Sequence, residues 1–526
     1  MVMVFGGILH NKRKKLCVFL SENLGDSFFL LNFADKTYKR IIIMSAISHL
    51  QPAAIWHNFD LLTQVPRPSG HLEKVQKFLL DWAAEKGVEA HMDEAGNILM
   101  YKPAFPGYED RKVVTLQGHM DMVPQKTADS THDFENDPII TRIDGEWVKA
   151  TGTTLGADDG MAVATIMAIF EDDSIPHGPL EGFITTDEET TMYGVNHMAD
   201  GELKGEILLN LDNETHGEMV TGSAGGINLT AELEYKPVEV EEGDAAVKLV
   251  LTGLRGGHSG LEINEGRANA NKCICRVVMD GIANFEARLA SWQGGNMRNA
   301  IPRHAEVVLT LPAENVEAYL EVVRGEWAET LKAEFGYIEH DLQLTAEPCE
   351  LPTELVPEEI QDNLVNAIQA CHNGPLRFIP HLPTIVETSS NLAIIEIGQG
   401  KAFFKDLVRS SQDSMRQNCC DTLEAVFTMA GMRVETDGAY PAWQPSPESP
   451  IVELMKQVYR ELEGEENNVQ VCHAGLECSV ILSHCPGMDV VSFGPTLRSP
   501  HTPDERLLIE SVGKYYNFVL ETLKRI

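Results

Sequence analysis

Apolar and polar residues follow two different periods along the first part of the chain. Residues 73–86 carry apolar side chains at helical spacing, which predicts a helix packed against a core. A shorter amphipathic helix is predicted around 54–62. Residues 160–170 are apolar on nearly every side, which is typical of a helix buried against a sheet.

Short apolar and β-branched runs alternate with these helices and predict strands. They lie at residues 113–116, 180–186, 207–211 and, near the C-terminus, 489–493. Alternating strands and helices indicate an α/β fold, here a mixed or parallel sheet flanked by helices. Ligands of such sheets gather beyond the carboxyl ends of the strands, where we expect the functional residues.

The middle of the chain follows another pattern. Extended amphipathic segments, at 246–251 and 305–311, alternate with long helical stretches at 268–288 and 316–334. This pattern predicts an inserted α+β domain in which helices back a sheet.

The predicted domain organisation is therefore discontinuous. The inserted lid domain spans 227–433, and the proline-rich segment 440–445 indicates the return to the first domain. The catalytic domain then comprises residues 44–226 and 434–526. A chain of 526 residues exceeds the size at which one hydrophobic core keeps growing, so two domains are expected.

Residues 1–43 differ from the rest of the chain. They contain seven Lys/Arg residues, four of them at 12–15, against three acids, and five of the 19 phenylalanines. The apolar run precedes the basic cluster, the reverse of the order in a signal peptide. We interpret the segment as a poorly ordered extension or a mis-assigned start, with a functional tail as the alternative.

The net charge of the chain is −37, from 79 acidic and 42 basic residues. Such a field repels phosphate backbones and anionic membranes, so we expect neither nucleic-acid nor membrane partners. Solubility or adaptation to salt is an alternative reason for the acidity. The sequence has no apolar run of about 18 residues to span a membrane. The ten cysteines form no CxxC pattern, which favours a reducing, cytoplasmic location.

Acidic residues and histidines lie at the ends of apolar segments, and we expect each of these clusters at the carboxyl end of a strand of the sheet. Together they offer two imidazoles and several carboxylates, the donors that a pair of divalent ions needs, with one carboxylate left to activate water. This composition indicates metal-assisted hydrolysis. The candidates are His119, Asp121, Asp158, Glu188, Glu189, Asp212 and His501.

His119 and Asp121 lie two residues apart, so on an extended backbone their side chains share one side. We interpret His119 as a metal ligand whose other ring nitrogen is held by Asp121. Taken alone, such a histidine is more often a surface residue.

Asp158 lies in the tight turn Gly156–Gly160 before the apolar helix. Its two carboxylate oxygens could bind two ions, which lie about 3.5–4 Å apart in two-metal sites. The alternative is a helix N-cap, for which aspartate is favoured. Both interpretations can hold if Asp158 and its neighbour Asp159 share the two roles.

Glu188 and Glu189 are adjacent carboxylates directly after an apolar strand. They repel each other, and burial would raise their pKa unless cations compensate. A division of roles resolves this: Glu189 binds metal, and Glu188 takes the proton from water. A solvated loop is the alternative. Asp212 and His501 would complete the two coordination shells.

From residue 44 onward the sequence resembles the aminoacyl-histidine dipeptidases (Xaa-His dipeptidases, carnosine-splitting enzymes) within the co-catalytic zinc metallopeptidases. The resemblance is carried by long motifs, whereas residues 1–43 have no counterpart. The motifs are Gln117–Gln125, Gly145–Ala150, Thr153–Asp158, Gly256–Gly260, Arg298–Arg303, His473–Cys478 and Pro500–Glu505.

The resemblance implies two zinc ions, with Co²⁺ or Mn²⁺ as substitutes. One ion would be bound by His119, Asp158 and Asp212, and the other by Asp158, Glu189 and His501. It also implies that Asp121 orients His119, that Glu188 is the general base for a zinc-bridged water, and that the peptide after Asp158 is cis.

One triplet departs from the family pattern. Asp187-Glu188-Glu189 replaces the usual Thr-Glu-Glu. The departure leaves open whether Asp187 or Glu188 is the base.

The resemblance also assigns three residues of the predicted lid. His258, in a glycine-rich turn, would donate to the substrate carbonyl oxygen as it becomes an oxyanion. Asn299 and Arg409 would bind the substrate's terminal carboxylate, for which the N–H fork of arginine is well suited. Without the metal motifs, a plain hairpin with a surface histidine would be the better interpretation of this turn.

The implied function is that of a cytoplasmic dizinc dipeptidase, a homodimer that cleaves Xaa-His dipeptides such as carnosine. An amidase or deacylase of N-acyl amino acids is the second hypothesis. A non-enzymatic binding relative is the third, and it is disfavoured because every candidate ligand and base is present.

Overall fold

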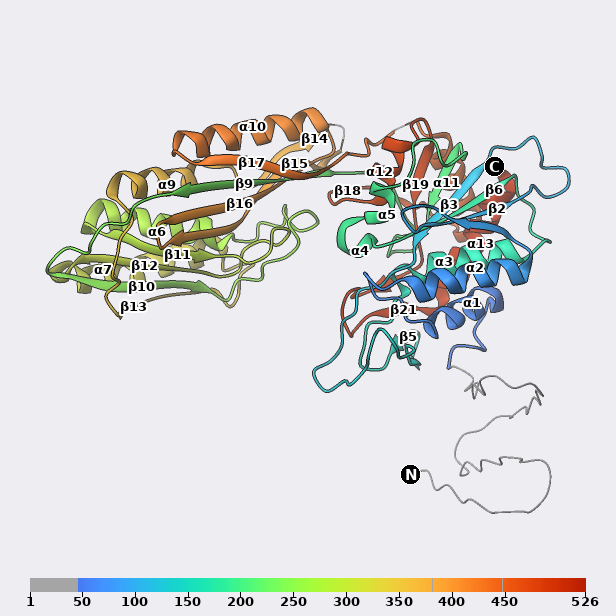
Figure 1. Cartoon of the computed structure of the whole chain (residues 1–526), viewed down its shortest axis with the longest axis horizontal. Coiled ribbons are helices and arrows are strands. Elements are labelled where there is room, and N and C mark those ends of the chain that lie inside the picture. The colour runs from blue at the N-terminus through green and yellow to red at the C-terminus, as the bar shows by residue number, and fades with distance from the viewer. Residues whose placement is uncertain (1–45, 381, 447) are drawn as a thin grey trace, which may run out of the picture. The chain divides into compact units, whose positions relative to one another are not determined.

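A computed structural model describes residues 46–380, 382–446 and 448–526 (Figure 1). The predictions made for residues 1–43 lie outside the described residues. The described chain builds three sheets: one of eight strands, one of nine and one of four.

The eight-stranded sheet is mixed, as predicted for the α/β part. Its order is β1-β2-β6-β3-β7-β19-β8-β18, and β3 pairs in parallel with both β6 and β7, while β19 pairs in parallel with β7. The strands are β1 (Glu89–Met92), β2 (Ile98–Lys102), β3 (Val114–His119), β6 (Leu180–Thr185), β7 (Ile207–Asn210), β8 (Glu218–Ser223), β18 (Asn468–Cys472) and β19 (Asp489–Ser492).

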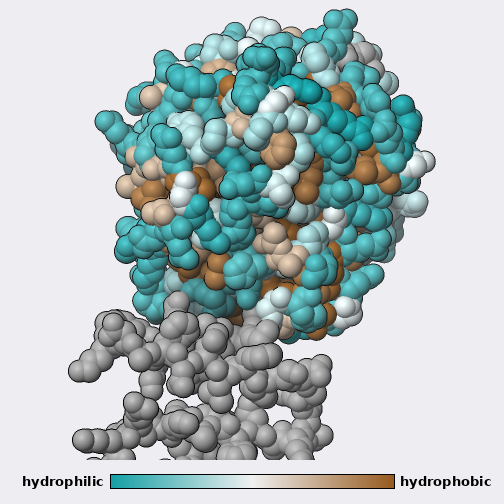
Figure 2. Space-filling model, turned by 90° about the vertical axis from the view of Figure 1, so that its right-hand side faces the viewer, coloured by the Kyte–Doolittle hydropathy of each residue, from teal (hydrophilic) through white to brown (hydrophobic). Residues whose placement is uncertain are grey.

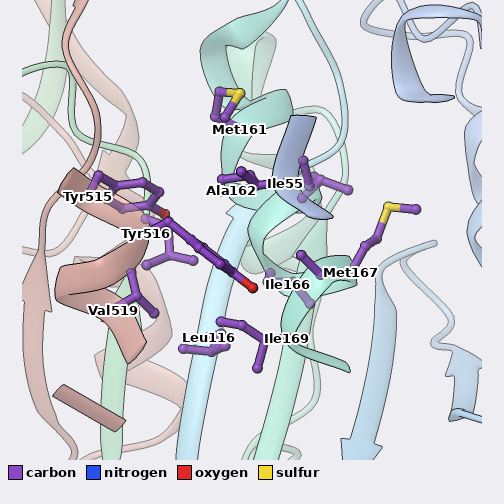
Figure 3. Packing of buried hydrophobic residues seen from close by; sticks show 14 of the residues in the cluster. Ile55, Leu116, Met161, Ala162, Ile166, Met167, Ile169, Tyr515, Tyr516 and Val519 are labelled. Carbon is purple, nitrogen blue, oxygen red and sulfur yellow. The ribbon is translucent and has the colours of Figure 1, made fainter. Parts of the chain in front are cut away.

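Helices pack against this sheet, and the apolar helix α3 lies in the hydrophobic core between them. In Figure 3, Met161, Ala162 and Ile166 of α3 lie near Tyr515 and Val519 of α13, and all five residues are buried. This confirms the prediction of a helix buried on nearly every side. The helices are α1 (Ala53–Thr63), α2 (Glu73–Lys86), α3 (Ala157–Glu171), α4 (Glu188–Thr191), α5 (Tyr193–Asn196), α11 (Pro450–Glu463), α12 (Glu477–His484) and α13 (Ile509–Arg525).

A four-stranded sheet in the same part of the chain was not predicted. It has the order β20-β21-β5-β4, so it pairs a segment near residue 150 with one near residue 506. Its strands are β4 (Thr141–Asp144), β5 (Trp147–Ala150), β20 (Leu497–Arg498) and β21 (Arg506–Leu508).

This sheet corrects one expectation about the candidate ligands. His119, Glu189 and Asp212 do follow strands β3, β6 and β7 of the large sheet. Asp158 instead lies in the first turn of α3, and His501 lies between β20 and β21. The expectation that every ligand follows a strand of one sheet is therefore wrong for these two.

The inserted part contains the nine-stranded sheet, which confirms the predicted lid of sheet and helices. Its order is β13-β10-β12-β11-β15-β16-β9-β17, with β14 paired to β15. The strands are β9 (Gly225–Glu234), β10 (Asp244–Thr252), β11 (Arg288–Gly294), β12 (Ala305–Pro312), β13 (Gln343–Cys349), β14 (Gly374–Ile379), β15 (Leu382–Gly398), β16 (Lys401–Ser410) and β17 (Arg433–Tyr440).

The helices of this part are α6 (Ala270–Phe285), α7 (Val316–Val322), α8 (Ala328–Phe335), α9 (Glu358–Ala370) and α10 (Asp413–Met429). A π-helical turn, Val323–Trp327, joins α7 to α8. The helix predicted to reach residue 288 ends earlier, because Glu286 adopts a left-handed φ of 57° and Arg288 begins β11. The domain boundaries stay a prediction; the sheet itself begins at Gly225 and ends at Tyr440.

The face shown in Figure 2 is mainly hydrophilic, with hydrophobic residues in small separate groups. No helix of the described residues is both long and apolar enough to cross a membrane.

Candidate functional site

His119 stands at the carboxyl end of β3, a strand in which every residue is buried. Its Nε2 atom lies 3.2 Å from Oδ1 of Asp158 and 3.8 Å from Oδ1 of Asp212. The parallel pairing of β3 with β7 brings the residues after both strands to the same edge of the sheet. One imidazole therefore faces two carboxylates from remote parts of the chain.

The second oxygen of Asp158 faces another set of residues. Oδ2 of Asp158 lies 3.1 Å from Nε2 of His501, which in turn lies 2.9 Å from Oε2 of Glu189. Asp158 thus connects two groups, with His119 and Asp212 on one oxygen and His501 and Glu189 on the other.

The spacing of these atoms fits metal binding. Zinc bonds nitrogen and oxygen ligands at about 2.0–2.1 Å, so two ligands of a tetrahedral ion stand about 3.3 Å apart. The four distances above, 3.2, 3.8, 3.1 and 2.9 Å, lie around that value. Among the described residues, Oε1 of Glu189 is buried without a hydrogen-bond partner. This oxygen is therefore available to bind a cation.

Asp121 is buried beside this cluster and organises it. Its Oδ1 lies 3.4 Å from Nδ1 of His119, whose Nδ1 also lies 3.2 Å from the backbone oxygen of Asp121. The carboxylate also accepts hydrogen bonds from the backbone N–H of Glu188 (3.1 Å) and Glu189 (3.3 Å) and from the hydroxyl of Ser69 (2.7 Å). One aspartate thus links the His119 strand to the two glutamates.

Asp159 can be assigned to the helix rather than to a metal. Its carboxylate lies close enough to His119 and Asp212 to form a second candidate group with them. However, its Oδ1 accepts from the backbone N–H of Ala162 and its Oδ2 from that of His119. Both oxygens therefore have partners, which fits the predicted N-cap. The peptide between Asp158 and Asp159 is cis, as expected.

The electrostatics of the cluster favour added positive charge. Burial raises the pKa of Glu188 to about 8, and burial and nearby acids raise the pKa of Asp212 well above its usual value. Burial alone would lower the pKa of His119, but Asp212, Asp121 and Asp158 raise it well above its usual value. Hydrogen bonds to Asp158 and Glu189 raise the pKa of His501 to about 11. A divalent cation would relieve this repulsion between carboxylates.

A second group of polar residues involves the inserted sheet. The guanidinium of Arg409, on β16, donates to the hydroxyl of Tyr440 (2.8 Å) and to that of Ser259 (3.4 Å). Its Nη2 lies 3.4 Å from Nε2 of His258. Arg409 is buried, so its charge is desolvated at this position.

The ring of His258 has a definable tautomer. Nδ1 accepts hydrogen bonds from the backbone N–H of Gly260 (3.2 Å) and Leu261 (3.0 Å). Burial and the charge of Arg409 lower the pKa of His258 to about 4, so the ring is neutral and its one proton is on Nε2. His258 therefore presents an N–H donor on the side of Arg409.

The structure brings together the predicted metal ligands, and it brings the predicted lid residues together in a second group. Asn299 is exposed, and its backbone oxygen accepts from the N–H of Ser259 (2.9 Å). His258, Asn299 and Arg409 are thus neighbours through Ser259. Among the described residues, no hydrogen bond or ion pair joins them to the metal cluster.

Four buried polar residues at or near these groups were not assigned from the sequence. Glu477 accepts hydrogen bonds from Gln117 (2.6 Å) and Thr185 (2.7 Å). Nε2 of His473 lies 2.8 Å from the Ser389 hydroxyl. The signal for three of the four was the motifs His473–Cys478 and Pro500–Glu505. The four residues are Arg67, His473, Glu477 and Glu505.

Comparison with known proteins supports these observations. Residues 115–525 match peptidase family M20/M25/M40. The cytosol non-specific dipeptidase of Escherichia coli (strain K12) is 40% identical over 483 residues, 92% of this chain and 99% of that protein. The structure of aminoacylhistidine dipeptidase from Vibrio alginolyticus has a TM-score of 0.83 and 41% identity, covering 92% of this chain and 98% of that one. Aminopeptidase PepT from Bacillus cereus ATCC 10987, at 16% identity, a TM-score of 0.52 and coverage of 90% and 98%, shares the fold alone.

Proposed function

The chain belongs to peptidase family M20/M25/M40, and from this we propose that it is a metal-dependent dipeptidase that accepts Xaa-His dipeptides. The observation that carries the proposal is the position of Asp158, whose two oxygens face two separate sets of ligand atoms. Two proteins that are similar over 92% of the chain support the substrate class: one is named a non-specific dipeptidase and the other an aminoacylhistidine dipeptidase. We also propose a cytoplasmic location, because the E. coli relative is named as a cytosol dipeptidase.

We propose two zinc ions at this site, with Co²⁺ or Mn²⁺ as substitutes. His119, Asp158 and Asp212 would hold one, and Asp158, Glu189 and His501 the other, which leaves no carboxylate of the set without a cation. When bound, such ions polarise a carbonyl and lower the pKa of a water molecule. Asp121 would fix the orientation of His119.

In the proposed reaction, Glu188 takes a proton from the attacking water and passes it to the leaving amine. Its raised pKa is consistent with a group that both accepts and donates a proton near neutral pH. His258, with its proton on Nε2, would donate to the carbonyl oxygen as negative charge develops there. Arg409 and Asn299 would bind the terminal carboxylate. Among the described residues no hydrogen bond or ion pair joins the lid residues to the metal cluster, so in this proposal the substrate itself contacts both groups.

Hydrolysis of a small substrate panel by the zinc-loaded protein tests the proposal. We expect cleavage of Ala-His and β-alanyl-His, with Leu-Gly showing how far the enzyme extends beyond histidine. A tripeptide and an N-acetyl amino acid should be poor substrates. Cleavage of the acetyl compound without cleavage of any dipeptide would instead support the amidase hypothesis.

Replacing Arg409 with methionine should raise KM for dipeptides by about 10–100-fold. This is the loss of affinity expected when one or two hydrogen bonds to a charged group are removed. The wild-type enzyme should prefer Ala-His over its C-terminal amide, and Arg409→Met should lose that preference, measured as the ratio of kcat/KM values. Tyr440→Phe is the matched control, because it removes a partner of the guanidinium but keeps the charge. An unchanged ratio in Arg409→Met would exclude Arg409 from carboxylate binding.

The family resemblance also leads us to propose a homodimer. Light scattering of the purified protein tests this, and a monomer at working concentrations would exclude it.

A further inference from the structure

The backbone that carries Asp158 is held by a buried carboxylate, Glu505. Oε2 of Glu505 accepts from the N–H of Leu155 (2.6 Å) and Gly156 (3.0 Å), and Oε1 accepts from Ala157 (2.8 Å) and Asp158 (3.4 Å). Four consecutive N–H groups therefore point at one side chain, which is buried. Since these groups lie at the N-terminus of α3, the carboxylate also faces the positive end of that helix.

Arg67 holds the same loop from the other side. Its guanidinium donates to the backbone oxygens of Met120 (3.0 Å) and Asp121 (3.1 Å), and also to that of Gly156. The peptide groups of Gly156 are thus bound by both charged side chains. Gly156 has a φ of +69°, and a Cβ there would lie 2.7 Å from Nη2 of Arg67, so the position requires glycine.

These two side chains connect the three segments from which the proposed ligands come. Arg67 binds the segment after His119, both residues bind the segment before Asp158, and Glu505 lies four positions after His501. Asp158 and His501 are the two ligands that no strand end of the large sheet positions. Contacts of this kind therefore act with the four-stranded sheet, whose strands β20 and β21 flank His501, to set their separation.

We propose that Glu505 and Arg67 are positioning residues of the metal centre, which fix Asp158 relative to His119 and His501. The inference rests on the proposed function, since it concerns the same metal site. Neither residue needs to touch metal or substrate. Second-sphere groups of this type contribute about 10–100-fold to metal affinity or activity.

The alternative is that Glu505 merely satisfies buried N–H groups, and the chain offers a matched control for it. Glu181, on β6, is also buried and accepts from the N–H of Lys204 (2.9 Å) and Gly205 (2.9 Å) and from the hydroxyl of Thr115 (2.8 Å). It lies near the start of β6, whereas the candidate ligands follow the end of that strand. Its loss disturbs the same domain away from the site.

The test compares Glu505→Gln, Glu181→Gln and the wild-type protein. Zinc affinity is measured by competition with a chromophoric chelator, and kcat and KM are measured on Ala-His at saturating zinc. Glutamine keeps the size of the side chain but turns an NH₂ group toward N–H donors and removes the charge. We expect Glu505→Gln to bind zinc about 10–100-fold more weakly and to lose kcat at unchanged KM, while Glu181→Gln matches the wild type in both.

Equal zinc affinity in Glu505→Gln and the wild type would overturn the inference, as would an equal loss in Glu181→Gln. If Glu505→Gln does not fold, Arg67→Lys decides, because lysine keeps the charge but not the fork that reaches three oxygens; wild-type affinity in that variant overturns the inference. A wild-type protein that binds zinc but cleaves no dipeptide contradicts the proposed function alone. A wild-type protein that binds no zinc contradicts both.

Discussion

Asp158→Asn is expected to lose both zinc ions and, with them, all dipeptide hydrolysis. Each oxygen of Asp158 faces its own set of ligand atoms, and asparagine can offer only one oxygen, because its NH₂ group is a donor. The substitution also removes the charge that lies between the imidazoles of His119 and His501. Metal content after dialysis at fixed free zinc should fall to background, and activity to that of chelator-treated wild-type protein.

The neighbouring residue provides the control for this experiment. Asp159→Asn keeps a side-chain oxygen that can accept from the N–H of Ala162, so α3 retains its cap. We expect this variant to keep both ions and to lose about 1–3 kcal/mol of folding stability, because the N–H of His119 loses its acceptor. Two ions retained in Asp158→Asn would show that Asp158 does not bridge the site.

The sequence predicts those elements whose own residues determine them. The predicted helix 73–86 coincides with α2, because an apolar face runs its whole length and Gly87, with a left-handed φ of 73°, ends it. Strands β6 and β7 are likewise short, mainly apolar segments in which every residue is buried. In these cases periodicity and burial point to the same structure.

The four-stranded sheet could not be predicted in the same way. Its strands have two to four residues, too few to show a period, and they pair residues as distant as Lys149 and Arg506. The positions of Asp158 and His501 depend on this sheet and on buried contacts. His501 and Asp187 also adopt left-handed φ values of 59° and 51°, which are uncommon for non-glycine residues, although Asp and His adopt them more often than most.

Burial of charge is the other feature that the sequence does not show. Arg67 and Glu505 belong to residue types that are mostly exposed, and nothing near them in the chain indicates that both are buried. Arg409 was named for its chemistry, but its partners Tyr440 and Ser259 come from remote segments. Such partners become visible only when the loops are assembled.

Glu188→Gln is expected to lower kcat by about 10²–10⁴-fold, the usual contribution of a general base, with metal content and KM unchanged. Glutamine cannot accept the proton of water, but it keeps the size of the side chain and the backbone N–H that Asp121 binds. The adjacent Glu189 contacts His501 at 2.9 Å, and residues next to each other on a helix do not face the same direction. This geometry is consistent with the proposed division of roles between the two glutamates. Turnover of Ala-His and metal analysis of the same sample measure both properties.

Two neighbouring variants identify which acid is the base. Glu189→Gln should lose metal as well as activity, because its carboxylate is a proposed ligand. Asp187→Asn should retain most activity, since Oδ1 of Asp187 accepts from the N–H of Gly70 at 2.5 Å and asparagine keeps an oxygen for that bond. If Asp187→Asn lost turnover with full metal content while Glu188→Gln kept it, the base would be the residue by which this chain departs from the family pattern, and Glu188 would only shape the site.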